Sequence, residues 1–231
     1  PGKSLALVSG KPLIQRVVEQ ARKATRLDEV VVATDDNRIR KAVERIGAKA
    51  VMTRPDHVSG TDRIAEAVKN VQADIVINIQ GDEPLIDPEL IDALGLVLAS
   101  DATWDMATAA APIDDPRDLD NPAVVKVVFG RQGQALYFSR SVIPYLRDGK
   151  ADLGEETLHW RHIGIYAYRR SFLEKFVAAP PCVLEKAEKL EQLRALDLGC
   201  RMKVVKTAAC GIGVDMPEDV ARVEEAIGKA E

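Results

Sequence analysis

The sequence predicts an α/β fold with a mainly parallel, mixed sheet that is covered by helices on both faces and carries an extended β insertion. Two observations predict it. Short β-branched runs alternate with helical segments over residues 11–98 and again over 188–230, which is typical of a parallel sheet. Between them, residues 104–170 carry mainly extended segments. We expect one domain over residues 1–231, with the segment around 104–170 serving as a lid or a dimer contact.

The first elements follow from periodicity and from end signals. Residues 11–25 are expected to form a helix with Pro12 in its first turn, followed by a buried strand over 29–34. Asp35 and Asp36 are expected to cap a helix that Gly47 ends. Further along, we expect a strand over 48–53, a helix over 61–71, a strand over 74–79 and a helix over 88–98.

The alternation of strands and helices stops after Trp104 and resumes near residue 188. Extended segments are expected over 106–111, 124–129, 134–138 and 162–168. The stretch from Gly130 to Gly133 between two of them predicts a hairpin turn, and Gly149–Glu156 predicts a mobile loop. The last expected elements are a helix over 188–198, a strand over 202–207 and a helix over 217–230.

Composition argues against several protein classes. With 46% hydrophobic residues, 29% charged residues and a net charge of −4, the chain is neither disordered nor suited to nucleic acid. The odd set of cysteines, Cys182, Cys200 and Cys210, contains no CxxC spacing and favours reduced thiols. No apolar run reaches the roughly 18–20 residues of a membrane helix, and no signal peptide is visible. We therefore expect a cytoplasmic protein.

A glycine-rich loop opens the sequence. Gly2-Lys3-Ser4 resembles the end of a Walker A motif, but that motif requires a helix directly after it, whereas a second loop with Gly10 and Lys11 follows. We favour an anion-binding loop in which Lys3 and Lys11 supply positive charge beside backbone N–H groups. Two solvated lysines remain the alternative.

Two acidic turns are expected at the carboxyl edge of the sheet, where ligands of α/β folds gather. Asp82 follows the apolar strand over 74–79, and Asp215 follows the glycines Gly211 and Gly213. Each aspartate could instead simply cap the next helix. If both meet at one edge, they would form a divalent-cation site with open positions for a nucleotide.

The stretch Ser59-Gly60-Thr61-Asp62-Arg63 has two interpretations. It could be a plain helix start, with Thr61 as the cap and Asp62 at the positive end of the helix. It could also hold a base or a ribose through short side chains and backbone groups. Spacing alone does not choose between the two.

The histidines, His57, His159 and His162, form no metal-binding pair in the sequence. His162 could be structural, or it could line an anionic pocket with Arg140, Arg161 and Lys126. No arrangement of a nucleophile with a histidine is indicated, so covalent catalysis is not expected.

Nine stretches, spread in order over essentially the whole chain, form a specific set. They are PGK…GKP (1–12), VVVATDD (30–36), SGTDRIAE (59–66), VINIQGDEP (76–84), NPAVVKVV (121–128), ALYFSR (135–140), RHIGIYAYR (161–169), EKLEQLRAL (188–196) and GVDMPEDVARVE (213–224). Together they resemble the 3-deoxy-manno-octulosonate (Kdo) cytidylyltransferases, or CMP-Kdo synthetases. QGDEP, YFSR, HIGIY and LEQLR carry most of the resemblance.

The resemblance implies a three-layer, nucleotide-diphospho-sugar-transferase-like (Rossmann-like) fold working as a homodimer. It implies that CTP and Kdo give CMP-Kdo and pyrophosphate for bacterial lipopolysaccharide biosynthesis, with Mg²⁺ as cofactor. By motif position, Asp82 and Asp215 would bind the metal and, with Lys3 and Lys11, carry catalysis. The implied nucleotide-binding residues are Lys3, Lys11, Ser59, Gly60, Arg63 and Asp82. The implied sugar-binding residues are Gln80, Arg140, His162, Glu191 and Gln192.

Other interpretations stay open. The sugar could be 8-amino-Kdo or a sialic acid, although HIGIY and LEQLR favour a Kdo-type sugar, and a non-catalytic nucleotide-binding protein is the rival from another class. The family has a strand and an arginine-bearing loop of the type IPARxxSTR before PGK, which this sequence does not contain, and usually proline where Ser4 stands. Either the sequence begins late or the protein is impaired.

Overall fold

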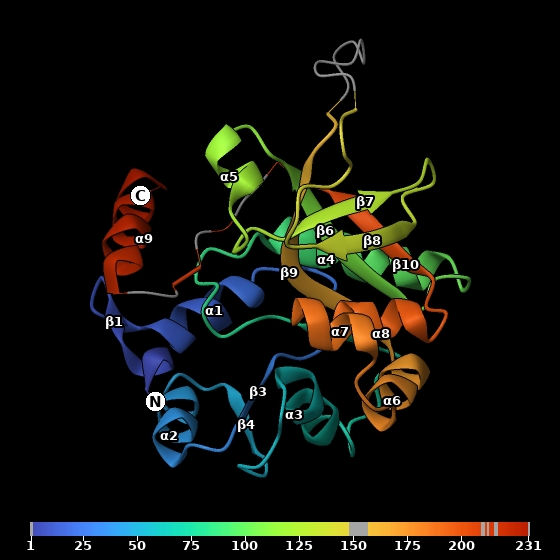
Figure 1. Ribbon diagram of the computed structural model, residues 1–231. Helices are drawn as coiled ribbons and strands as arrows, with labels where there is room; N and C mark the ends of the chain where they lie inside the picture. Colours follow the sequence, from blue (N-terminus) through green and yellow to red (C-terminus); the bar gives the residue numbers. More distant parts are fainter. Residues whose placement is uncertain (1, 148–156, 209–210, 212, 215–216, 231) are drawn as a thin grey trace. The chain divides into compact units, whose positions relative to one another are not determined.

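The computed structural model describes residues 2–147, 157–208, 211, 213–214 and 217–230 (Figure 1). The chain divides into two compact units, one formed by Pro1–Leu96 with Gly211–Glu231 and the other by Val97–Cys210. The second unit contains the segment expected as an insertion. The single-domain boundary stays a prediction, and the expected loop Gly149–Glu156 lies outside the described residues.

The first unit begins with a short antiparallel hairpin. A 3₁₀ turn η1 (Lys3–Leu5) leads into β1 (Leu7–Val8), which pairs with β2 (Lys11–Pro12) before α1 (Leu13–Ala21) starts. The expected helix start at Lys11 was wrong because Pro12 takes an extended conformation and precedes the helix as its N-cap. Only a 3₁₀ turn follows Gly2, so no Walker A loop is formed.

The next elements agree with the expected rhythm. Strand β3 (Val31–Thr34) runs parallel to β4 (Lys49–Met52), and α2 (Asn37–Arg45) connects them. Asp36 caps α2 by accepting a hydrogen bond from the Arg38 amide, and Gly47 follows the helix with a φ of 64°, a conformation that favours glycine. A buried cluster joins α1 to these elements through Ile14, Val18, Val32, Val43 and Ala48.

Four further elements complete the first unit, although α4 continues into the second. They are α3 (Gly60–Ala67), β5 (Ile75–Asn78), α4 (Pro88–Ser100) and α9 (Pro217–Ala230). Helix α9 packs on the N-terminal hairpin in a buried cluster of Val8, Leu13, Val214 and Val223. The carboxylate of Asp92 on α4 accepts hydrogen bonds from the Thr25 and Arg26 amides and so holds the segment after α1.

The second unit contains strands hydrogen-bonded in the order β10-β6-β9-β7-β8. They are β6 (Met106–Pro112), β7 (Lys126–Phe129), β8 (Ala135–Ser139), β9 (Trp160–Arg169) and β10 (Met202–Lys206). β10 runs parallel to β6, whereas β6–β9, β9–β7 and β7–β8 are antiparallel. The mixed sheet is therefore confirmed, and Gly130–Gly133 forms the expected turn, with the Gly133 amide donating to the Gly130 carbonyl.

Helices pack beside this sheet. α5 (Pro116–Asp120) and α6 (Arg170–Ala178) were not expected from the sequence. The helix expected over 188–198 is present as α8 (Gln192–Asp197) but begins four residues later, and α7 (Val183–Glu188), which precedes it, was not expected. Lys189 breaks the path with a φ of 56°, a left-handed conformation that ends helices.

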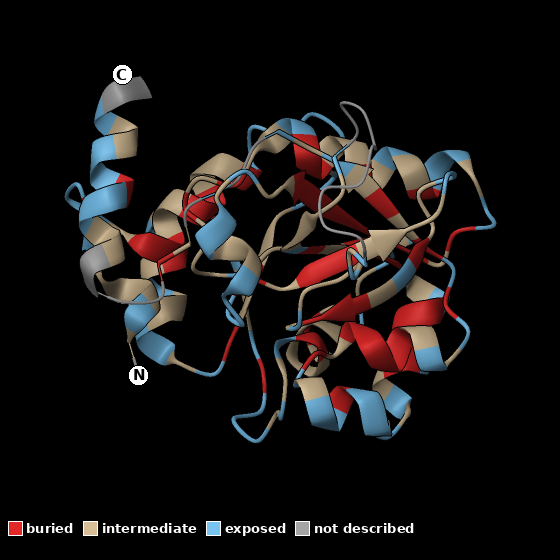
Figure 2. Cartoon of the chain, turned by 45° about the horizontal axis from the view of Figure 1, so that its top comes forward, coloured by how far each residue is buried: buried red, intermediate tan, exposed pale blue. Residues whose placement is uncertain are grey.

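Many of the buried residues lie on the strands of this sheet. The interior strand β6 carries small side chains, and Ala107, Ala109 and Ala110 are fully buried. Figure 2 shows buried residues along strands and on the inner faces of helices, while the outer helix faces are exposed. Cys182 and Cys200 are free thiols, and Cys210 lies outside the described residues. None of the described helices has the length and apolar character that a bilayer crossing requires.

Candidate functional site

The centre of the candidate site is the turn that follows β5. Asp82 lies in this turn, and its Oδ2 is 2.9 Å from the Nζ of Lys3. The Glu83 amide closes the turn by donating to the Gln80 carbonyl. Both charged side chains remain substantially exposed, at 40% for Lys3 and 35% for Asp82. The structure therefore brings together one expected phosphate-loop lysine and one expected metal ligand, in a position open to a ligand.

The segment before α9 lies against the same turn. The Val214 amide donates to the Asp82 carbonyl at 2.9 Å. A Cβ atom on Gly211 would come 2.9 Å from one carboxylate oxygen of Glu83, and one on Gly213 would come 3.2 Å from the other. A side chain at either position would therefore require the end of the flexible Glu83 side chain to shift. Asp215 itself lies outside the described residues, directly after Val214.

The donors at this turn suit a magnesium ion. Mg²⁺ is commonly held by one or two carboxylates, with waters and substrate phosphates completing its shell. The Asp82 carboxylate already attracts the ammonium group of Lys3, and the Glu83 carboxylate lies beside it in sequence. Within the described ranges, no group of three or more His, Cys, Asp or Glu side chains is placed to hold a metal ion.

Lys11 occupies a different environment. Its Nζ pairs with Glu19 on α1, at 2.8 Å from Oε2. The hairpin around it is anchored by Arg16, whose Nε donates to the Val8 carbonyl at 2.6 Å, and by Glu224 of α9, which accepts from the Ser9 amide. To bind a phosphate, the Lys11 ammonium group would have to break its ion pair with Glu19 or contact Glu19 and the phosphate together.

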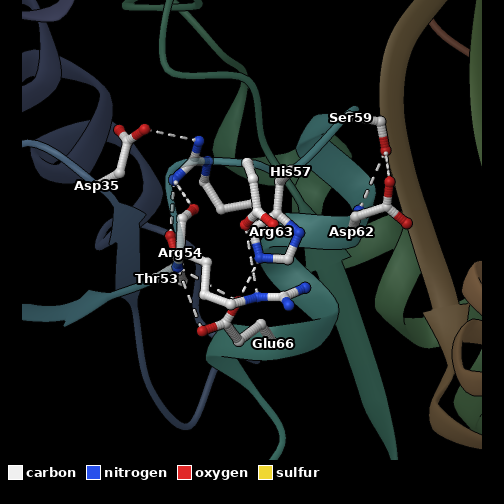
Figure 3. Close-up of polar contacts among 9 residues, drawn as sticks. Asp35, Thr53, Arg54, His57, Ser59, Asp62, Arg63 and Glu66 are labelled. Carbon is white, nitrogen blue, oxygen red and sulfur yellow. Dashed lines mark hydrogen bonds and ion pairs between the residues drawn. The ribbon is translucent and has the colours of Figure 1, made fainter.

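The expected nucleotide segment starts α3 (Figure 3). Ser59 is the N-cap: its hydroxyl accepts from the Asp62 amide and donates to the Asp62 carboxylate. The expectation that Thr61 caps the helix was wrong, because the helix already begins at Gly60 and Thr61 is buried within it. Arg63 on the first turn pairs with Asp35, which follows β3, at 3.1 Å.

Of the residues expected to bind the sugar, Gln80 belongs to the first unit and the other four to the second. Gln80 is exposed, and its amide nitrogen donates to the Asn78 side chain at 3.3 Å. In the second unit, Arg140 follows β8 and is held by backbone: its Nε donates to the Glu188 carbonyl and its Nη1 to the Pro122 carbonyl. Glu188 completes this contact by accepting from the Arg140 amide.

His162 is the third residue of β9. Its Nε2 is 2.9 Å from the Thr108 hydroxyl on β6, and that hydroxyl donates to the Ile165 carbonyl at 2.8 Å. Since the hydroxyl proton is used there, we assign the shared proton to His162 Nε2. The ring packs against Phe138 and Tyr166, and burial lowers the pKa of His162 to about 3. At neutral pH the imidazole is therefore uncharged, with Nδ1 as an acceptor.

Glu191 and Gln192 lie at the start of α8. Glu191 is the N-cap residue and Gln192 is buried within the first turn. Burial raises the pKa of the Tyr166 hydroxyl, and the nearby charges of Tyr168 and Glu191 act in the same direction. The ring of Tyr166 lies against that of His162, so both belong to one part of β9.

The anionic pocket expected from Lys126 and Arg161 is not formed by these two residues. Lys126 is fully buried, and its Nζ donates to the carbonyls of Asn121, Val124 and Arg140. Arg161 pairs with Asp118 at 3.2 Å. The sequence could not reveal these contacts, because it does not distinguish a lysine that donates to backbone carbonyls from one that is exposed to solvent.

Several supporting residues were missed. Glu83, Glu188, Thr108 and Glu66 each contact an expected site residue or its loop. Glu83 stood within the QGDEP motif and Glu188 at the start of EKLEQLRAL, so the motifs contained a signal for both. Thr108, 54 positions from His162, carried no local signal, because only the strand pairing brings the two together.

Comparisons with known proteins agree with one another. A family model described as "Cytidylyltransferase" matches residues 1–203. A 3-deoxy-manno-octulosonate cytidylyltransferase of Pelobacter propionicus is 49% identical, over 97% of this chain and 91% of its own length. The enzyme of the same name from Bdellovibrio bacteriovorus is 50% identical, over 97% and 91%.

Solved structures extend the likeness to the fold. A CMP:2-keto-3-deoxy-manno-octonic acid synthetase complexed with CTP superposes with a TM-score of 0.93 at 42% identity, covering all of this chain and 93% of that one. A 4-diphosphocytidyl-2C-methyl-D-erythritol synthase of Anaerococcus prevotii superposes with a TM-score of 0.66 at 14% identity, over 99% and 94% of the two chains. This second likeness concerns the fold alone.

Proposed function

Because the chain belongs to the 3-deoxy-manno-octulosonate cytidylyltransferase family, we propose that it activates Kdo with CTP, giving CMP-Kdo and pyrophosphate. The observation that carries this proposal at the level of residues is the pair of Lys3 with Asp82, beside the Val214 segment. Lys3, which would bind the triphosphate, and Asp82, which would bind the cation, lie side by side at the turn that follows β5. The reaction requires both groups close to the nucleotide.

The reaction is an in-line transfer at phosphorus. The oxygen of the sugar's anomeric hydroxyl forms a bond to the α-phosphorus, the bond from that phosphorus to the bridging oxygen of pyrophosphate breaks, and the hydroxyl proton passes to water. Such a transfer depends on positioning and on charge neutralisation rather than on a protein nucleophile. The residues of the site therefore act by binding and orienting the two substrates.

We assign these tasks to the residues as follows. Lys3 would offset charge that builds up on the leaving pyrophosphate, with Lys11 assisting once it is released from Glu19. Asp82 and Asp215 would hold magnesium. Bound magnesium supplies charge neutralisation on the phosphates and lowers the pKa of a hydroxyl in its shell. Ser59, Gly60 and Arg63 form the segment for the cytidine end of CTP.

The sugar site would use hydrogen bonds and one cation. His162, neutral and with Nδ1 as an acceptor, suits a sugar hydroxyl better than a carboxylate, since it carries no positive charge. Arg140 remains the cation for the sugar acid, and its guanidinium is oriented by the Glu188 and Pro122 carbonyls. Glu191 and Gln192 would supply further polar contacts, and the assignment of Gln80 to the sugar stays a prediction.

The assembly and the setting are further inferences. We infer a homodimer that works in the cytoplasm, for lipopolysaccharide biosynthesis, from the resemblance in sequence motifs. Light scattering after size-exclusion chromatography measures the oligomeric state directly.

A single assay tests the proposed reaction. The protein is incubated with CTP, Mg²⁺ and one sugar acid at a time, namely Kdo, 8-amino-Kdo or a sialic acid, and pyrophosphate release is followed. We expect turnover with Kdo and much slower turnover with the sialic acid. Preference for 8-amino-Kdo would change the sugar assignment, and CTP binding without any turnover would refute the enzyme.

A further inference from the structure

Residues 53–66 form a cluster of polar contacts around the start of α3 (Figure 3). The cluster links three parts of the first unit: the end of β3, the segment after β4, and the first two turns of α3. It surrounds Ser59 and Gly60, which we place in the nucleotide site. Arg63, on the first turn of α3, lies within this cluster.

The guanidinium of Arg63 is directed at protein acceptors. Its Nη2 donates to Asp35 Oδ2 at 3.1 Å, and its Nη1 donates to the Thr53 hydroxyl at 2.7 Å. Nη1 also reaches the Arg54 carbonyl at 3.4 Å. The side chain is only 21% exposed. The two terminal nitrogens thus donate to residues that directly follow the parallel strands β3 and β4. A guanidinium group held at both nitrogens in this way is rigid.

Glu66 secures the other side of the same segment. Its carboxylate accepts hydrogen bonds from the Arg54 amide and lies 3.5 Å from Arg54 Nε. It also forms a short contact with His57 Nε2, and the His57 side chain is only 7% exposed. Residues 54–57 are therefore attached to α3 one turn beyond Arg63, which restricts the backbone that leads into Ser59.

The geometry points to Arg63 as a positioning residue of the nucleotide site, acting through Asp35 and Thr53 rather than by touching the nucleotide. This inference rests on the proposed function and refines it. Arg63 ties the ends of β3 and β4 to α3, and Glu66 with His57 fixes the segment between them. The backbone of residues 54–60 then holds a conformation ready for the cytidine end of CTP, so less ordering is needed on binding.

A double-mutant cycle between Arg63 and Asp35 tests this role, because a pair that works as one unit gives non-additive effects. We expect Arg63→Ala and Asp35→Ala each to weaken CTP binding roughly tenfold, about 1.4 kcal/mol, measured by calorimetry. The double variant should be no weaker than Arg63→Ala. Arg38→Ala is the matched control, since Arg38 pairs with Asp36 within the first turn of α2 and should leave CTP affinity unchanged.

A second readout separates an effect at the cytidine end, which CTP and CMP share, from a contact with the β- and γ-phosphates, which only CTP carries. If Arg63 only shapes the segment, affinities for CTP and CMP should fall by the same factor. An Asp35→Ala variant that binds CTP as well as or better than the wild type would overturn the inference. So would an Arg63→Ala variant that loses CTP affinity while keeping CMP affinity.

Folding and function are checked separately. If the alanine variants do not fold, Arg63→Lys and Asp35→Asn replace them, and each should weaken CTP binding roughly threefold, about 0.7 kcal/mol. Unchanged CTP affinity in both would also reject the role. Turnover of the wild type with CTP and Kdo is measured first, so a failure of the proposed function appears there and not in the cycle.

Discussion

The Val214 amide donates a hydrogen bond to the Asp82 carbonyl at 2.9 Å, although the two residues lie 132 positions apart in the chain. This contact joins the turn after β5 to the segment before α9. The turn carries Asp82, and Asp215 follows Val214 directly. This contact between the two loops is the structural reason to expect that both aspartates bind one cation.

The first prediction concerns the metal carboxylates. We expect Asp82→Asn and Asp215→Asn each to lower pyrophosphate release by roughly 10²–10³-fold or more, because they remove charge that holds the metal in the transition state. Stability should change little, since the pair of Asp82 with Lys3 is exposed and such pairs contribute about 0–1 kcal/mol. Glu29→Gln is the control, because Glu29 forms a similar surface pair with Lys49. Near wild-type turnover in either aspartate variant would remove the metal assignment.

The second prediction concerns the glycines beside Glu83. A methyl group on Gly213 would approach Glu83 Oε1 at 3.2 Å, so Gly213→Ala should push the flexible Glu83 carboxylate, which lies beside Asp82 in the sequence, a few tenths of an ångström away. We expect Mn²⁺ binding in the presence of CTP to weaken roughly threefold, about 0.7 kcal/mol. In a Glu83→Ala background the same substitution should have a smaller effect, because the collision is gone. Equal effects of Gly213→Ala in both backgrounds would show that Glu83 is not the obstacle.

Much of the fold could be predicted because its signals are local. The α2 boundaries follow from Asp36 and Gly47, which the structure uses as expected. Other features could not be predicted because the deciding interaction is distant or has several candidates. Thr61 was expected to cap α3, and only the structure shows that Ser59 is used. The break at Lys189 is carried by a residue that seldom adopts a positive φ, so no sequence signal marked it.

The third prediction concerns Lys126. Its ammonium group is the shared donor for three backbone carbonyls in a fully buried position. Lys126→Met keeps the stem but leaves these carbonyls without their partner, and an unsatisfied buried group costs about 1–3 kcal/mol. We expect the free energy of unfolding, from urea titration, to fall by about 3 kcal/mol. Lys175→Met, whose Nζ serves one exposed carbonyl, should lose under about 1 kcal/mol; equal losses would contradict the role of Lys126.

The last prediction concerns the acid sensitivity that His162 gives to the fold. Its pKa is lowered to about 3 in the folded protein from an ordinary value of 6.5. Between these values the unfolded chain binds a proton that the folded chain does not. Stability from this group is therefore complete above pH 6.5 and is lost as the pH falls toward 3, by up to about 1.4 kcal/mol per pH unit.

The comparison variant is His162→Gln, which cannot titrate and can still donate to the Thr108 hydroxyl. Both proteins are unfolded with urea at pH 7, 6, 5 and 4 without substrates. Carboxylates with lowered pKa values, such as Asp36 at about 2, affect both proteins equally, so the difference isolates the histidine. As the pH falls below 6.5, we expect the free energy of unfolding to decrease less in the variant than in the wild type. Parallel stability curves would mean that the imidazole accepts its proton within the fold and that the sugar site presents a cation at this position.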